Sequence, residues 1–211
     1  MKREIITGVI GILIGFVVGF FAANARQPEN AATAAAPQVG QPSNAGAPSP
    51  AGAMPEGHPP QEVINQVREM KKTAEREPNN VEVRAQLANM YFDIGRYADS
   101  IDFYTQALAL DPNNINYRTD RATAYHYLGQ TEPAMADLKR SLEIDPTHPP
   151  SLFNLGVVRL HGLKDPKGAV EAWEHFVRLN PKSPATPKVQ EQIDKLKQQL
   201  AADAAKGRKS S

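Results

Sequence analysis

The sequence predicts an all-α solenoid of three helix-turn-helix repeats, because of its internal self-similarity, its regularly placed prolines and the apolar face of each expected helix. The self-similarity has a period of about 34 residues, which is typical of solenoid repeats. It predicts repeats over residues 81–114, 115–148 and 149–183, the third with one extra residue in its internal turn. Each unit ends with a proline after Asp or Asn, and proline disfavours helical backbone at the residue before it. The predicted helix stops are therefore Pro112, Pro146 and Pro181.

Small and large residues recur at matching places in the three units. The small residues Ala88, Ala122 and Gly156 would let the first helix of each unit approach its partner closely. Large aromatic residues would fill the space between units, namely Tyr91, Tyr104, Tyr125 and Trp173. With these residues the chain resembles the tetratricopeptide repeat (TPR) family. The resemblance implies a TPR α-solenoid that binds peptides or proteins and is not an enzyme.

Two positions depart from the family pattern: Arg121 stands where a buried Leu is usual, and Ser141 where Ala is usual. In one interpretation Arg121 lays its stem across the core and carries its head to a carboxylate such as Asp120 or Asp137. In the other, Arg121 contacts a ligand. The sequence leaves both interpretations open.

Further helices are predicted on both sides of the repeats. Residues 61–77 form a leading helix that resembles the second helix of a truncated repeat. Residues 186–204 form a capping helix, in which Thr186 can cap and Pro187 can take the first helical position. Residues 205–211 are expected to form a solvated tail.

The N-terminus predicts a membrane anchor. Residues 5–23 are apolar apart from one threonine, and about 20 apolar residues suffice to cross a bilayer. Residues 1–4 carry two cations, so the N-terminus is expected in the cytoplasm of a bacterium, with the anchor in the inner membrane and the repeats in the periplasm. The alternative is a cleaved signal sequence, because Ala23-Asn24-Ala25 resembles a small-x-small cleavage site.

The anchor and the segment after it suggest two further properties. Three glycines spaced four apart in the anchor allow homo-oligomers or packing against a partner helix, although glycine is common in membrane helices; they are Gly11, Gly15 and Gly19. Residues 24–60 are rich in Ala, Pro and Gly, and such a composition predicts a disordered tether, because it buries too little surface to offset ordering entropy.

Composition argues against several functions. Cysteine is absent, which excludes thiol nucleophiles, disulfides and covalent haem attachment. No two of the five histidines stand three or four apart on a helix, so we predict no metal site and no cofactor. The net charge of +1 provides no basic field for nucleic acid.

The family resemblance also implies a client-binding groove lined by the first helix of each repeat. Only Asn89 matches a carboxylate clamp, since Ala85 and Asp93 stand where Lys is expected. The resemblance instead favours an amphipathic helix or apolar peptide as client, although some of the aromatic residues could simply close seams between repeats. The predicted peptide-binding residues are Asn89, Phe92, Asp93, Thr123, His126, Tyr127, Phe153, Val157, Leu160 and His161.

The order of parts, an anchor, a leading helix, three repeats and a cap, resembles the TPR proteins of bacterial cytochrome c biogenesis. That resemblance implies an adaptor that presents apocytochrome or a haem-ligation component near the membrane. Two alternatives are an adaptor for pilus, secretion or envelope assembly, and a homo-oligomeric scaffold without a dedicated client.

Overall fold

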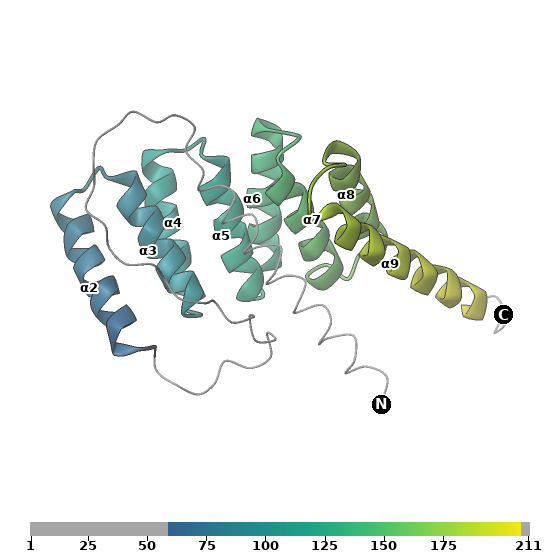
Figure 1. The fold of residues 1–211 in the computed structure, drawn as a ribbon, viewed down its shortest axis with the longest axis horizontal. Coiled ribbons are helices and arrows are strands. Elements are labelled where there is room, and N and C mark those ends of the chain that lie inside the picture. The colour runs from purple at the N-terminus through teal and green to yellow at the C-terminus, as the bar shows by residue number, and fades with distance from the viewer. Residues whose placement is uncertain (1–58, 208–211) are drawn as a thin grey trace. The chain divides into compact units, whose positions relative to one another are not determined.

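The computed structural model describes residues 59–207, and this part of the chain is wholly helical, with eight α-helices and no strand (Figure 1). The predicted all-α class is confirmed for these residues. The helices are α2 (Gln61–Arg76), α3 (Val81–Asp93), α4 (Tyr97–Leu110), α5 (Ile115–Tyr127), α6 (Thr131–Ile144), α7 (Pro149–His161), α8 (Pro166–Leu179) and α9 (Thr186–Gly207).

The predicted membrane anchor over residues 5–23, its three glycines and nearly all of the predicted tether lie outside the described residues. Within residues 59–207, none of the helices combines the length and apolar character that a membrane crossing requires.

The helices pack as a nearest-neighbour stack. Helices α3 and α4, α5 and α6, and α7 and α8 form three antiparallel pairs, and successive pairs meet through α4 with α5 and α6 with α7. Helix α2 packs on α3, α9 packs on α8, and α5 also contacts α7 (Figure 1). Contact between sequence neighbours is the defining property of a solenoid.

Local sequence explains where the helices begin and turn. The side chains of Asn80 and Asn114 accept hydrogen bonds from the backbone N–H three residues later, at 3.1 Å in both cases. This is N-capping, which satisfies an otherwise unpaired donor at a helix start. Gly95 and Gly129 adopt φ values of 75° and 72° in the turns inside the first two pairs. In the third pair, Lys164 adopts φ 56°.

The third helix pair packs around one tryptophan. The indole N–H of Trp173 donates to the backbone carbonyl of Phe153 at 3.0 Å. A Cβ atom at Gly156 would overlap the same indole ring, so only glycine lets α7 and α8 approach this closely. The small residue that the repeat pattern requires here therefore makes room for a specific side chain.

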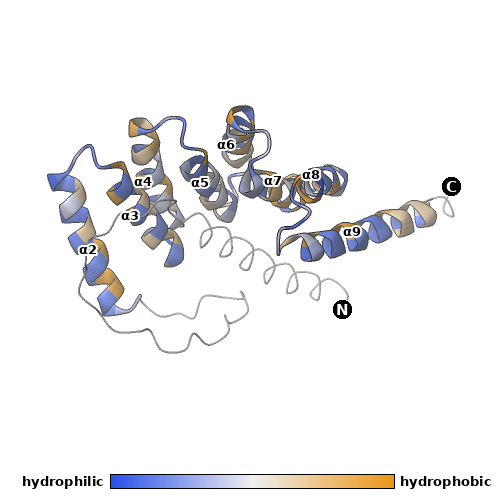
Figure 2. Ribbon diagram, turned by 45° about the horizontal axis from the view of Figure 1, so that its top comes forward, coloured by the Kyte–Doolittle hydropathy of each residue, from blue (hydrophilic) through white to orange (hydrophobic). Residues whose placement is uncertain are grey.

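Helix α9 covers the last pair with part of its length. Val189 and Ile193 are buried on α8, whereas the following turns of the helix extend beyond the stack (Figure 2). Thr186 does not cap α9 as predicted, because it is itself the first helical residue and its hydroxyl donates to the carbonyl of Asn180. This bond satisfies a carbonyl at the end of α8 instead.

Arg121 forms a partly buried ion pair. Its guanidinium donates two hydrogen bonds to the carboxylate of Asp137, both at 2.8 Å, and a third to the hydroxyl of Thr105 at 3.0 Å. A nitrogen of Arg118 lies 3.6 Å from the same carboxylate. The interpretation that Arg121 carries its head to a carboxylate is confirmed, and the partner is Asp137.

Candidate peptide-binding site

A chain of ring contacts begins in the first helix pair and crosses to the second. Phe92, near the end of α3, contacts Tyr97 at the start of α4, with ring centroids 5.2 Å apart. Phe92 also contacts Tyr127, the last residue of α5, edge to face at 5.4 Å. Tyr97 stacks on Tyr127 with centroids 4.9 Å apart. Three rings from three helices therefore form one mutually supporting group.

The chain of rings continues into the third pair. The ring of Tyr127 lies 6.1 Å from that of His126, and His126 lies 6.4 Å from His161 at the end of α7. We call the five residues the aromatic ladder: Phe92, Tyr97, His126, Tyr127 and His161. The ladder spans all three helix pairs, and four of its members were predicted site residues.

Exposed apolar residues adjoin ladder residues in the sequence, since Leu128 follows Tyr127 and Leu163 comes two residues after His161. Tyr127 keeps 41% of its surface exposed, Leu128 keeps 41%, and Leu163, in the turn after α7, keeps 47%. The turns of neighbouring pairs approach one another, because a Cβ atom at Gly162 would lie 2.7 Å from the methyl group of Thr131. The ladder and its neighbours thus place apolar surface in contact with water, which is a property of binding sites when such residues cluster.

The ladder is uncharged at neutral pH. Burial raises the pKa of Tyr97, and burial together with Tyr97 raises the pKa of Tyr127. Burial, with a smaller effect of Lys164, lowers the pKa of His126. Burial, the neighbouring His126 and Lys164 together lower the pKa of His161 to about 4. The phenols therefore keep their protons and the imidazoles stay neutral, which suits an apolar ligand.

Other predicted site residues are used in packing between helices. The side-chain oxygen of Asn89 accepts a hydrogen bond from the hydroxyl of Tyr104. The hydroxyl of Thr123 donates to the backbone carbonyl of Thr119 at 3.0 Å and accepts from the amide of Asn154 at 3.0 Å. These bonds join α3 to α4 and α5 to α7. Leu160 is half-buried, and Asp93 is exposed at the end of α3.

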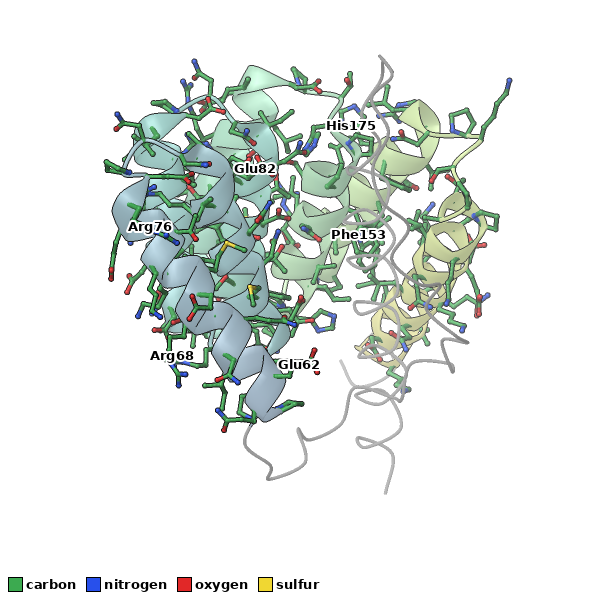
Figure 3. All side chains as sticks on the ribbon, turned by 60° about the vertical axis from the view of Figure 1, so that its left-hand side comes forward. Glu62, Arg68, Arg76, Glu82, Phe153 and His175 are labelled. Carbon is green, nitrogen blue, oxygen red and sulfur yellow. The ribbon has the colours of Figure 1, made fainter. Side chains whose placement is uncertain are left out.

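Phe153 and Val157 differ from the prediction, because each is only 4% exposed. The ring of Phe153 lies 6.1 Å from Trp173 and 6.2 Å from Phe176, so it belongs to the core of the third pair. Figure 3 shows Phe153 within the stack of helices, whereas the exposed Arg68 and Arg76 project from α2. The two apolar residues support the array and offer no open surface to a client.

Sequence reasoning missed Tyr97, Leu128 and Leu163. The prediction took site residues from the first helix of each repeat, whereas these three residues begin a second helix or follow a first helix. The sequence does carry a signal for Tyr97. It follows the turn glycine Gly95 by two residues, so it starts α4 close to the end of α3. Among residues 59–207, no group of three or more potential metal ligands of the His, Cys, Asp and Glu types is present.

Comparisons with known proteins identify the repeats. Residues 81–114 and 115–148 each match a family model described as tetratricopeptide repeat. No curated protein matches the chain significantly.

Solved structures match the helical stack. The first TPR of Spaghetti (RPAP3), bound to the HSP90 peptide SRMEEVD, shares 26% identity over 57% of this chain and 93% of its own, with a TM-score of 0.52. The first TPR domain of human RPAP3 shares 26% identity over 61% and 98%, with a TM-score of 0.54. The MamA protein shares 23% over 71% and 80%, with a TM-score of 0.57, and shows likeness of fold only.

The stacked helix pairs, the glycine turns and the two family matches agree. TPR repeats are protein-interaction modules and usually carry no enzymatic activity. Residues 81–148 therefore contain two tetratricopeptide repeats, and the helical stack is similar to a peptide-binding TPR domain.

Proposed function

We propose that the aromatic ladder, with Leu128 and Leu163 beside it, is the surface on which this TPR domain binds a peptide or protein client. The observation that carries the proposal is the ladder's combination of fixed rings with an exposed face at Tyr127, which is 41% exposed. Tyrosine gives large contact area at a low entropy cost and is enriched at the centres of interfaces. The client is an apolar segment, such as one face of an amphipathic helix.

The composition of the ladder predicts a client that differs in charge from the peptide in the RPAP3 complex. That peptide, SRMEEVD, contains three acidic residues. At the positions where the TPR carboxylate clamp would have lysine, this chain has Ala85, which is 2% exposed, and Asp93. Asp93 disfavours an acidic peptide because like charges repel. The uncharged ladder disfavours it as well, because a carboxylate of the peptide would lose its hydration there without gaining a partner.

The setting of this function is also part of the proposal. Residues 5–23 anchor the protein in a bacterial inner membrane, and the segment 24–60 tethers the TPR domain in the periplasm. There the domain presents apocytochrome or a haem-ligation component during cytochrome c maturation. The apolar run and the order of parts support this placement, and an envelope-assembly adaptor is the second candidate on the same grounds.

Site-specific photo-crosslinking tests the client surface. A photoreactive benzoylphenylalanine replaces Leu128 or Leu163 in the full chain, and matched controls carry it at Leu110 or Leu179, which are each 40% exposed at the ends of α4 and α8. Irradiation in cells followed by mass spectrometry identifies what is captured. We expect a shared client at the two ladder positions and not at the controls. Equal capture at all four positions would overturn the proposed surface.

Capture also reports the pathway. Apocytochromes or haem-ligation subunits would support cytochrome c maturation, and envelope-assembly proteins would support the second candidate. Capture of the chain itself alone would favour a homo-oligomeric scaffold and contradict both adaptor proposals.

A further inference from the structure

Two histidines of adjacent repeats lie close together at the end of the aromatic ladder. His126 lies in the last turn of α5 and His161 ends α7, and their ring centroids are 6.4 Å apart. They stand 35 residues apart in the sequence, so only the stacking of the second and third pairs brings them together. Both side chains are half-buried.

The two imidazoles differ in their bonding from the buried His148. Both ring nitrogens of His148 are hydrogen-bonded, one to Ser151 at 2.8 Å and one to Asn116 at 3.0 Å. Within residues 59–207, neither His126 nor His161 makes a hydrogen bond to another residue through its ring nitrogens. Their nitrogen lone pairs are therefore available to an external ligand, and the neutral imidazole is a common metal ligand.

We propose that His126 and His161 together bind one transition-metal ion of the Cu²⁺, Ni²⁺ and Zn²⁺ class, with water completing its coordination. Imidazole suits these ions, whereas Mg²⁺ and Ca²⁺ prefer oxygen ligands.

The separation of the rings fits a shared ion after a small adjustment. Metal–nitrogen bonds of about 2.0–2.1 Å place two ligating rings with centroids roughly 5 to 6 Å apart, depending on the angle at the metal. The observed 6.4 Å requires the rings to approach by roughly 0.5 to 1.5 Å, which side-chain rotation can supply. The ion would clamp α5 to α7, and this part of the proposal does not depend on the client.

The positive charge of Lys164 makes it possible to test whether the site binds a cation or an anion. It holds φ 56° in the turn where the other two pairs have glycine, and it lies close enough to lower the pKa values of both His126 and His161. Its positive charge opposes a bound cation and would favour a bound anion. Removal of that charge therefore strengthens a metal site and weakens an anion site.

The test is a titration of the full-length protein, purified without a polyhistidine tag, with Ni²⁺ and Cu²⁺ by calorimetry. We expect one equivalent to bind, and the double variant H126Q/H161Q to lose at least about tenfold in affinity, since even residues behind metal ligands commonly cost this much. The matched control H58Q/H175Q removes two histidines and keeps the pair, and it should bind as the wild type does. The Cu²⁺ complex should show electron-spin coupling to two imidazole nitrogens.

Two further measurements complete the test. The variant K164Q should bind Ni²⁺ more tightly than the wild type, and saturating Ni²⁺ should raise the midpoint of thermal unfolding for the wild type and not for H126Q/H161Q. Equal Ni²⁺ affinity in the wild type and H126Q/H161Q would overturn the site. Weaker Ni²⁺ binding by K164Q would also overturn it, as would phosphate binding that is lost in K164Q while Ni²⁺ fails to bind.

Discussion

Tyr97 stacks on Tyr127 across two repeats, with ring centroids 4.9 Å apart and planes inclined by 22°. Phe92 contacts both rings, so Tyr127 is held from two sides while 41% of its surface faces solvent. A side chain that is already immobilised loses little rotamer entropy when it binds a partner. The arrangement therefore presents a rigid aromatic face, which is what an efficient contact for an apolar client requires.

The stack should be measurable as a coupling between its two tyrosines. We expect Y97A and Y127A to destabilise the array by amounts that do not add, with a coupling of about 0.5–1.5 kcal/mol, which is typical of aromatic pairs. Urea unfolding of the wild type, both single variants and the double variant gives the coupling directly. Strict additivity of the two losses would show that the rings do not support one another.

Gly156 should tolerate no side chain. A Cβ atom there would overlap the indole of Trp173, which is fixed by its bond to the carbonyl of Phe153. We expect G156A to reduce the free energy of unfolding by about 1–3 kcal/mol, the usual cost of overpacking a core. In the background W173F, which has a smaller ring, the added cost of G156A should be lower. An unchanged unfolding midpoint for G156A would contradict the packing described.

Replacement of Phe153 by a charged residue should destabilise the fold. It is 4% exposed between Trp173 and Phe176, and F153D would bury a carboxylate without a partner. We expect F153D to unfold the third helix pair, seen as a loss of helical circular dichroism at 25 °C. A fully folded F153D would show that the ring can leave the core and would return Phe153 to the set of client-binding residues.

Asp137 should contribute more than a surface ion pair. Its side chain is 8% exposed and holds Arg121, which is 15% exposed, through two hydrogen bonds. D137N leaves Arg121 and Arg118 without a counter-charge, and breaking such a pair costs about 3 kcal/mol. The matched control E69Q removes an exposed pair with Lys72 and should cost about 1 kcal/mol or less. Equal losses for the two variants in urea unfolding would contradict this assignment.

His148 should make the array less stable in acid. Burial lowers the pKa of His148 below its ordinary value of 6.5, with a smaller opposing effect of Asp145. The unfolded chain then takes up a proton at higher pH than the folded chain does. The stability that the neutral His148 contributes is complete above pH 6.5 and is lost as the pH falls through the lowered folded pKa.

The measurement for His148 is the free energy of unfolding at pH 7 and pH 5. We expect it to fall between the two values in the wild type and to fall less in H148N, whose amide can still bond Ser151 but does not titrate in this range. An identical decrease in both proteins would assign the acid sensitivity to other groups.

The repeat pattern predicted the helical stack because the same buried position must hold a small residue in each unit. Ala88, Ala122 and Gly156 are all buried, and the fit of Gly156 to Trp173 shows why the position must be small. For Arg121 the sequence offered a carboxylate partner as one of two interpretations, since a charged residue at a buried position needs a partner, and the choice of Asp137 came from the structure.

The site was only partly predictable. The first-helix rule selected Phe153 and Val157 together with Tyr127, and it could not tell which side chains the neighbouring helices cover. The contacts of Tyr97 with Tyr127 and of His126 with His161 join residues of different repeats, so they depend on how the pairs stack. Local pattern does not fix that geometry to the accuracy that ring contacts require.

The most direct test of the central claim is the dissociation constant of the captured client segment for the full chain and two double variants. The variant Y127A/L163A removes exposed apolar surface at the ladder, and L110A/L179A removes comparably exposed side chains elsewhere. We predict that Y127A/L163A weakens binding at least about tenfold, or about 1.4 kcal/mol, while L110A/L179A leaves it unchanged. Equal affinity of the two variants, with both folded by circular dichroism, would contradict the assignment of the aromatic ladder as the client-binding surface.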